Sequence, residues 1–349
     1  MQNLTRAHNE LFKRSPDERF SSISELWQHC YDMKQWSTER WVPPAELAIK
    51  PTTSEIQAVV QDEALNFTEW SFRQICSLAA ISRDTVNKLS PETASLVFME
   101  TLPRGTKPLQ LFTMSNTIRS IHPASYTRLY DVELLNVIRE FAVDFQPAQK
   151  AKTLDDPNSG TPPATGLYCG SQDMFCFLID ATGWIDIEGQ AFAPGFFVWN
   201  SEVGRRTVGI QTFWFQSVCQ NHLIWDAVDV TEFRRKHTSN VGEALSNVRQ
   251  LIEQLVNRRD ERRDAFAATI ANAMKTKLGD DADEVLKILQ KHGITKTLGN
   301  EALKIAEEQG KFTIFSVVDA LTRLAGKQQN AGDRTAMDIK SSSLLALAV

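Results

Sequence analysis

The sequence has 349 residues, of which 42% are hydrophobic and 23% are charged, values typical of globular proteins. This composition excludes a wholly disordered chain, a collagen-like chain and a coiled-coil rod. The 38 Lys and Arg residues are outnumbered by 43 Asp and Glu residues, so the net charge is -5. Nucleic-acid binding over the whole surface is therefore excluded, and any such function must be confined to a patch.

Residues 1–146 are predicted to form an N-terminal α+β half. Apolar residues recur at helical spacing from Ile23 to Tyr31, behind serines that can cap the helix. Thr68 can cap a second helix, and Asp131 can cap a third and favour its N-terminus electrostatically. The other expected elements are strands at 47–51, 56–60 and 109–114, helices at 83–89 and 92–99, and a polar bend at 115–126.

Residues 147–165 are rich in proline and small polar residues, which predicts a loop or linker. The region 166–278 is predicted to be a β-rich half that ends in a long helix over 241–278. The first half of the run 207–219 is predicted to be a strand. The periodicity of its second half is compatible with either a helix or a buried strand. The other expected strands are 166–168, 174–180, 184–187 and 191–199.

Residues 279–326 are predicted to contain three shorter helices, at 282–292, 300–308 and 312–324. Residues 327–349 are rich in polar side chains and are expected to be a flexible tail, whose apolar end could dock on a neighbour. The predicted fold class is therefore α+β, with a mainly antiparallel sheet flanked by helices, one long basic helix and a helical C-terminal region.

Five scattered cysteines do not indicate a disulfide framework in a chain of this length. They are Cys30, Cys76, Cys169, Cys176 and Cys219. No pair forms a C-x-x-C motif, so a zinc site has no local nucleus and no cofactor is expected. We interpret these thiols as small buried hydrophobic groups.

The N-terminal residues lack the apolar core of a secretion signal. No run of about 18 apolar residues could cross a bilayer. We therefore expect a cytoplasmic protein that has no membrane partner.

Positive charge is concentrated in the segment 234–278, which has ten basic and five acidic residues. This segment therefore has a charge of +5, and the rest of the chain has a charge of -10, which together give the net charge of -5. A basic ridge of this kind could attract phosphate through counterion release. The alternative is a solvated helix held by ion pairs between residues four apart, for which 260–264 supplies acids.

A second basic cluster lies close to aromatic residues in the sequence. It contains Arg119, Arg128 and Arg139, with His122, Tyr126 and Tyr130 nearby. Guanidinium groups beside exposed aromatic rings can hold phosphates while the rings stack on unpaired bases. In the alternative interpretation the tyrosines belong to the core and Arg128 pairs with Asp131.

Gly204 is followed by two arginines, Arg205 and Arg206, at an expected turn after a strand. The backbone N–H groups of such a turn can form an anion-binding nest. The same residues also suit an ordinary hairpin connection.

Catalytic chemistry is not indicated by any compact motif. Cys219, Asn221 and His222 are adjacent, but thiol catalysis normally combines distant segments. Carboxylates of the predicted sheet could bind Mg²⁺ for phosphodiester cleavage, although surface acids are the simpler interpretation. These acids are Asp173, Asp180, Asp186, Glu188 and Glu202. The sequence contains neither of the glycine motifs that cradle nucleotide phosphates.

Six stretches in a fixed order give the chain a family resemblance. They are RSPDERFSSISELW, LNFTEWSFRQICSLAAI, IRSIHPASYTRLYDVELLNVI, FVWNSEVGRRTVGIQTFWFQSVCQNHLIWDAV, FRRKHTSNVGEAL and FTIFSVVDALTRLA, and they span residues 14–325. With them the chain resembles the phage/plasmid-like proteins grouped as domain of unknown function 932. That family occurs in prophages, plasmids and genomic islands and has no assigned activity.

The resemblance implies a mobile-element setting and supplies no catalytic residue. The family's recurring polar positions correspond here to Arg119, Tyr126, Asp131, Asn200, Ser201, Gly204, Cys219, Asn221 and His237. They mark the neighbourhood in which the resemblance places a site. In the last motif the family has Asn at the position of Asp319. This difference could change a helix cap or a contact, so no site residue is inferred there from the family.

These observations lead us to expect a non-catalytic protein that binds single-stranded nucleic acid, most simply DNA, during recombination, annealing or protection. Assembly into a homo-oligomer would extend its binding groove. The residues expected to bind nucleic acid are Arg119, Tyr126, Arg128, Arg205, Arg206, Arg234, Arg235, Lys236, Arg258, Arg259, Arg262 and Arg263. The alternatives are a Mg²⁺-dependent nuclease and a protein-binding assembly or inhibitor factor.

Overall fold

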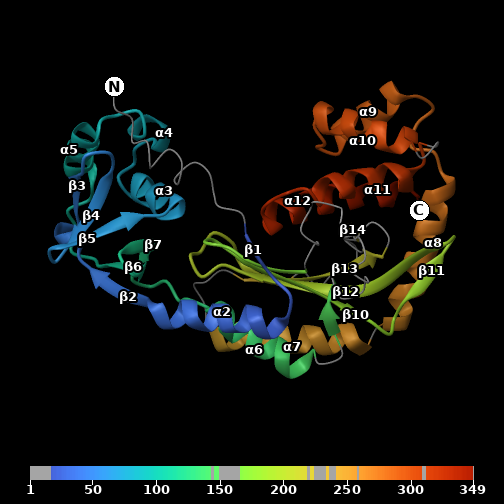
Figure 1. Cartoon of the computed structure of the whole chain (residues 1–349), viewed down its shortest axis with the longest axis horizontal. Coiled ribbons are helices and arrows are strands. Elements are labelled where there is room, and N and C mark those ends of the chain that lie inside the picture. The colour runs from blue at the N-terminus through green and yellow to red at the C-terminus, as the bar shows by residue number, and fades with distance from the viewer. Residues whose placement is uncertain are drawn as a thin grey trace.

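The computed structural model describes residues 17–142, 145–148, 166–217, 221–223, 233–235, 241–257, 259–308 and 312–348. They form two mostly antiparallel sheets with helices against them, which confirms the α+β class and the helical C-terminal region (Figure 1). None of the helices in these residues is both long enough and apolar enough to cross a membrane.

The first sheet lies entirely in the N-terminal half. Its strand order is β2 (Ser37–Val42), β6 (Leu109–Met114), β7 (Thr117–Pro123), β5 (Glu63–Phe67), β4 (Ile56–Val60) and β3 (Ala48–Pro51). All neighbours are antiparallel except β5 and β7. The predicted polar bend at 115–126 therefore contains a strand, because Ile118 and Ile121 are buried under the helices that cover this sheet.

Three helices pack with this first sheet around one apolar core. They are α3 (Glu69–Leu78), α4 (Arg83–Val86) and α5 (Pro91–Thr101), and a short turn η1 (Pro44–Glu46) joins β2 to β3. Each helix begins where the sequence offers a hydroxyl cap: Thr68, Ser82 and Ser90 accept hydrogen bonds from the first-turn N–H groups. Phe72, Ile75 and Phe98 are buried between helix and strand.

The second sheet is larger and gathers strands from both halves of the chain. Its main path is β1 (Glu18–Phe20), β9 (Leu167–Cys169), β10 (Met174–Asp180), β12 (Gln190–Asn200), β13 (Val208–Gln216) and β14 (Asn221–Leu223). Three shorter strands, β8 (Phe145–Pro147), β11 (Ile185–Ile187) and β15 (Phe233–Arg235), pair with β10, β12 and β13 respectively. The run 207–219 thus forms one buried strand up to Gln216.

The two faces of this sheet have different partners. Side chains alternate between the faces along each strand, so Cys176, Leu178 and Val198 pack towards helices α2 (Ile23–Trp36), α6 (Asp131–Phe141) and α7 (Val241–Asn257). These three helices lie along one side of the sheet in Figure 1. The intervening residues give the opposite face an aromatic surface made by Tyr168, Phe175, Phe177, Phe197, Trp199, Phe213 and Phe215.

The C-terminal helices form a third core at one end of the second sheet. They are α8 (Arg259–Lys275), α9 (Ala282–Lys291), α10 (Lys296–Glu308), α11 (Ile314–Ala325) and the short helix η3 (Ser343–Ala348). Helix α12 (Ala331–Ser342) lies between α11 and η3 in the chain, and its Ala331 packs on the aromatic face of the second sheet. Phe266 of α8 stacks on Trp214 of β13, with ring centroids 4.2 Å apart. In Figure 1 α11 and α12 run above the sheet, on the side opposite α6 and α7.

The predicted segment boundaries do not coincide with the packing of the helices. The long helix expected over 241–278 is present as α7 and α8, which pack in different cores on either side of residue 258. Helices α2 and α6 from the N-terminal half pack on the second sheet, so the halves share a core. Most of the predicted linker, residues 149–165, lies outside the described residues.

The prediction of a flexible tail over 327–349 is wrong for its described part, which forms α12 and η3. Leu344 and Leu345 are buried in the C-terminal core. Most side chains on the buried face of α12 are polar, among them Arg334, Thr335, Asp338 and Ser341, so hydropathy gave no signal for burial. The apolar end therefore packs on its own chain.

The buried carboxyl group of Asp338 makes α12 sensitive to pH. Burial raises its pKa to about 8, partly opposed by Arg334, whose Nε lies 3.6 Å from the carboxylate. In an unfolded chain an Asp ionises near pH 3.9, so between about pH 4 and pH 8 only the native state holds this proton. Raising the pH through this window therefore lowers the free energy of unfolding.

We expect Asp338→Asn to remove this contribution. Thermal melts at about pH 5 and pH 9 should show a smaller loss of Tm in the variant than in the wild type. Parallel losses of Tm in the two proteins would contradict the assignment.

Candidate functional site

The turn that follows β12 joins the two sheets. Residues 200–204 leave the second sheet and contact β7, α3 and the start of α6. The turn closes with a hydrogen bond from the Gly204 N–H to the Ser201 carbonyl, and Ser201 Oγ donates to the carbonyl of Gln172. We call residues 200–204 the junction turn.

Glu202 is the central charge of the junction turn. Its carboxylate is buried, with one oxygen 2.9 Å from Arg119 Nη1 of β7. The other oxygen accepts a hydrogen bond at 3.1 Å from the backbone N–H of Asp131, the first residue of α6. A carboxylate at a helix N-terminus is favoured by the helix dipole. Glu202 therefore connects the first sheet to a helix that packs under the second.

Arg128 is the second buried cation at the junction. Its Nε donates to Glu39 of β2 at 2.8 Å, and its Nη1 donates to the Glu202 carbonyl. The guanidinium lies 3.7 Å from the centroid of the Phe112 ring. Burial, with the nearby Glu39 carboxylate, raises the pKa of Tyr130 to about 12, so its hydroxyl stays protonated and donates to Glu39.

The remaining residues of the junction turn are fitted closely against the first sheet. The carbonyl of Val203 accepts hydrogen bonds from Trp70 Nε1 at 2.7 Å and from His122 Nε2 at 3.0 Å. Gly204 has φ of 73°, and a Cβ atom there would lie 2.7 Å from the His122 ring. Only glycine fits this position without strain. The His122 ring stacks on Tyr126 at 3.7 Å.

A group of thiols lies beside the junction turn. Asp131 accepts a hydrogen bond from Asn200 Nδ2 at 2.8 Å, and its carboxylate is close to the sulfur atoms of Cys30 and Cys169. Burial, and then the Glu202 carboxylate, raise the pKa of Asp131. The hydrogen bond from Cys30, aided by one from His29, lowers the pKa of Cys169 to about 7 although burial opposes it. These residues are chemically able to hold a metal ion.

A cavity of about 370 Å³ lies between the aromatic face of the second sheet and α12. Its floor includes Phe175, Phe197 and Trp199, and its rim includes Arg205 and Arg206. Residues of α12, among them Thr335 and Ile339, line the opposite side, and Thr207, Gln211, Gly332 and Ala336 complete the lining. We call this cavity the arginine–aromatic pocket.

Specific contacts fix the two arginines of this pocket. Arg206 Nε donates to Asp173 at 2.7 Å, and its guanidinium lies 5.6 Å from the Phe175 ring. Arg205 lies 5.6 Å from the ring of Trp70, and its backbone N–H donates to Ser201 Oγ of the junction turn. Both arginine side chains remain partly exposed. The junction turn therefore positions the rim of the pocket.

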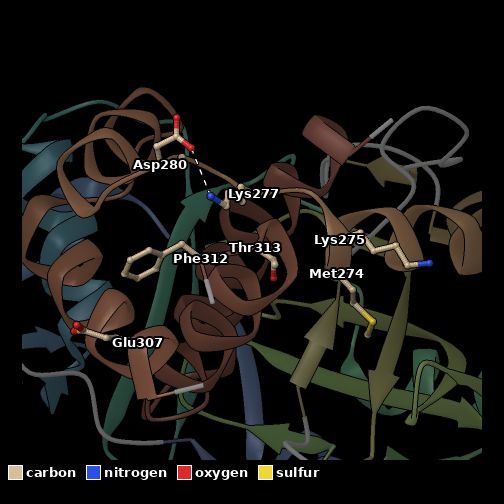
Figure 2. A pocket seen from close by; sticks show the side chains of 8 residues that line it. Met274, Lys275, Lys277, Asp280, Glu307, Phe312 and Thr313 are labelled. Carbon is tan, nitrogen blue, oxygen red and sulfur yellow. Dashed lines mark ion pairs between the residues drawn. The ribbon is translucent and has the colours of Figure 1, made fainter. Parts of the chain in front are cut away.

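A larger cavity of about 640 Å³ lies among the C-terminal helices. Figure 2 shows Met274 and Lys275 on one side of it and Glu307 and Phe312 on the other. Its charged groups point to no ligand, because Lys275 pairs with Glu188 and Lys277 pairs with Asp280, all of them largely exposed.

The residues that sequence analysis assigned to nucleic-acid binding fall into several groups. Arg119 and Arg128 are buried and paired with carboxylates, and Tyr126 is half-buried against His122. Arg205 and Arg206 line the arginine–aromatic pocket. Arg263 is exposed, pairs with Asp264, and lines a small cavity of about 90 Å³ beside Trp184 and Trp214.

The side chains of the other predicted residues are not described. Arg234 and Arg235 lie on β15, and Arg259 and Arg262 on α8, but only their backbone is placed. Lys236 and Arg258 lie outside the described residues, as do Cys219 and His237. Binding of nucleic acid by all of these residues stays a prediction.

The acids proposed for a Mg²⁺ site have separate partners. Asp173 pairs with Arg206, Asp180 accepts hydrogen bonds from Thr182, and Glu202 pairs with Arg119. Glu188 pairs with Lys275, and Asp186 accepts from the Gly189 N–H in the β11–β12 turn. The described residues therefore give no reason to join these acids in one metal site.

The sequence analysis did not identify Glu39 or Trp70 as site residues, and it did not predict that the Cys30 and Cys169 thiols lie close together. These residues meet only through the tertiary fold, so no local spacing indicated them. By contrast, six positions taken from the family resemblance gather at the junction turn. They are Arg119, Tyr126, Asp131, Asn200, Ser201 and Gly204.

The junction is expected to depend on the charge of Glu202. Glu202→Gln places an amide N–H₂ against Arg119 or against the Asp131 N–H and leaves a buried cation without its counter-charge. We expect a loss of about 3–5 kcal/mol in the free energy of unfolding, measured with urea. The control is Glu133→Gln, which breaks the half-exposed pair with Lys34 and should cost about 1 kcal/mol or less. Equal losses in the two variants would contradict the role of Glu202.

Comparison with known proteins finds similarity to one family model, whose function is unknown. The sequence model of that family, described as a domain of unknown function (DUF932), matches residues 180–325. No curated protein and no solved structure matches the chain. The matched region includes the junction turn and both pocket arginines, and it confirms the family resemblance for this part of the chain: residues 180–325 are similar to the DUF932 family.

Proposed function

We propose that this protein binds single-stranded nucleic acid, most simply DNA, in the arginine–aromatic pocket, and that it does so without catalysis. The setting would be annealing or protection of DNA during recombination in a phage- or plasmid-like element. The setting is drawn from the family resemblance. The binding mode is drawn from the pocket, and its cytoplasmic location is part of the same proposal.

The composition of the pocket supports this proposal. Proteins that bind single strands combine cations that hold phosphates with aromatic rings on which bases stack. Here two partly exposed arginines border a floor of aromatic rings. The cavity of about 370 Å³ falls in the range of roughly 300–1,000 Å³ that is typical of ligand sites.

The sheet supplies a rigid floor for the pocket. Phe175 and Trp199 are paired across β10 and β12, and Trp199 lies against Gly209 of β13. A Cβ atom at Gly209 would lie 2.1 Å from the Trp199 ring, so the absence of a side chain lets the indole lie flat on the strand. A flat, fixed ring loses little entropy when a base stacks on it.

The net charge of the molecule favours binding at a local patch. With a net charge of -5 the whole molecule repels polyanions, so affinity must come from a few well-placed cations. Arg119 and Arg128 are buried and paired with carboxylates, whereas Arg205 and Arg206 are partly exposed, although Arg206 also pairs with Asp173. The proposal therefore depends on Arg205 and Arg206, with self-association as a further means to lengthen the bound strand.

The proposal is tested with a fluorescently labelled single-stranded oligonucleotide and a salt titration of its anisotropy. For single strands the logarithm of affinity falls with the logarithm of salt by about 0.7 for each phosphate neutralised. Arg205→Gln should weaken binding and reduce this slope by about 0.7. The matched control is Lys304→Gln, which removes one exposed charge on α10 and should leave the slope unchanged.

Two results would contradict the proposal. One is a wild-type protein that does not bind the oligonucleotide even at low salt. The other is an Arg205→Gln variant, folded by its thermal melt, that binds with the same affinity and slope as the Lys304→Gln control.

A further inference from the structure

Two thiols and a carboxylate from three different elements meet beside the junction turn. Cys30 comes from the middle of α2, Cys169 from the end of β9, and Asp131 from the start of α6. Their two Sγ atoms and one carboxylate oxygen lie within 4.8 Å of one another. Among the described residues, this is the one group of three such ligands.

All three residues are buried, with exposed fractions of 1% for Cys30, 5% for Cys169 and 5% for Asp131. Buried acids and thiols are common as separate groups but costly together, because each anionic form needs a counter-charge. The Glu202 carboxylate adds to the negative charge around Asp131, and Arg119 is the cation that opposes it. One guanidinium is thus shared by two carboxylates next to two thiols.

A fourth donor stands at the edge of this group. His29, on α2 next to Cys30, interacts with the Cys169 thiol, but its nitrogen atoms lie outside the group of ligand atoms that are all within 4.8 Å of one another. Its side chain is 27% exposed, so it is the member of the group that faces solvent. His29 therefore provides both a nitrogen donor and a route by which an ion could enter.

A polar atom close to the group lacks a partner. Asn200 is fully buried, and its Nδ2 donates to Asp131 and to the Leu129 carbonyl. Its Oδ1 has no hydrogen-bond partner in the described part of the chain. A hydrogen bond that orients a ligating carboxylate, such as the one from Asn200 Nδ2 to Asp131, is typical of the outer shell of a metal site, and an unpaired buried oxygen beside it calls for an explanation such as a bound ion.

We propose that Cys30, Cys169 and Asp131 bind a zinc-type divalent cation, and that the partly exposed His29 side chain turns towards them to become the fourth donor. Two sulfurs, one nitrogen and one carboxylate oxygen form the tetrahedral set that zinc prefers, and thiolate ligands exclude Mg²⁺ and Ca²⁺. The ion supplies the positive charge that the two carboxylates and two thiols lack.

The position of this ion gives it a structural role. It would tie α2, β9 and α6 together immediately behind the Glu202 contact with the α6 N-terminus. A site with four protein ligands has no open coordination position, which is typical of structural zinc and not of catalytic zinc. The site is therefore independent of nucleic-acid binding at the arginine–aromatic pocket.

The other described cysteines offer a matched comparison. Cys76 and Cys176 are also buried, but neither lies within reach of two further ligands. Burial raises the pKa of the Cys76 thiol to about 12 although Arg83 opposes it, which is the behaviour of a thiol that packs as a hydrophobic group. Substitution of either residue should leave metal binding unchanged.

The test is a titration of the reduced, chelator-treated full chain with Co²⁺, followed by absorption spectroscopy. We expect one equivalent to bind with thiolate-to-cobalt charge transfer in the near ultraviolet and intense tetrahedral bands in the visible, both abolished by added Zn²⁺. Cys30→Ser and Cys169→Ser should lose the charge-transfer band, whereas Cys76→Ser and Cys176→Ser should keep it. His29→Gln should bind roughly 10–100-fold more weakly.

The thermal stability of the protein with and without Zn²⁺ gives a second test, which does not depend on the absorption spectrum of cobalt. Zn²⁺ should raise the Tm of the wild type and of Cys76→Ser but not that of Cys169→Ser. The proposal is overturned if the wild type shows no thiolate–cobalt band. It is equally overturned if the band survives in the Cys30→Ser/Cys169→Ser double variant, since the ion would then be bound by other residues.

Discussion

The contact of Glu202 with Arg119 and with the N-terminus of α6 is the interaction on which the arrangement of the molecule depends. A carboxylate is taken out of water at this point, and its desolvation is offset only while both partners stay in place. Arg119 belongs to the first sheet, whereas α6 packs under the second. The two sheets therefore meet at this buried carboxylate, beside the contacts that Arg128 and Trp70 make with the backbone of the junction turn.

Two chemically different sites lie on either side of this contact. Towards α2, Asp131 brings its carboxylate to the thiols of Cys30 and Cys169. In the other direction the chain continues from Gly204 to Arg205 and Arg206 at the rim of the arginine–aromatic pocket. The junction turn thus sets the positions of both groups. A change at Glu202 is expected to disturb both, whereas changes within either site should act locally.

Much of the fold could be predicted from sequence, because helix caps and alternating apolar residues act locally. Thr68, Ser82 and Ser90 cap helices near the expected positions, and the β-rich region after residue 166 forms the expected antiparallel strands. The packing of α12 could not be predicted, because most of its buried side chains are polar and meet partners distant in sequence, such as Tyr168, the partner of Arg334.

The candidate sites were predicted only in part, for the same physical reason. The basic residues stood out in the sequence, but charge alone does not distinguish Arg119 and Arg128, which are buried, from Arg205 and Arg206, which are partly exposed. Cys30 and Cys169 gave no spacing signal, because the elements that carry them are distant in sequence. Only the pairing of β1 with β9, beside α2, brings the two thiols together.

The most direct test of the binding site is hydrogen–deuterium exchange of the full chain with and without a single-stranded oligonucleotide. Bound nucleic acid should slow exchange at residues 205–207 and at 332–339 of α12, which border the pocket from opposite sides, and leave α9 and α10 unchanged. Protection that is confined to other segments, or is absent although the oligonucleotide is bound, would contradict the assignment of function to the arginine–aromatic pocket.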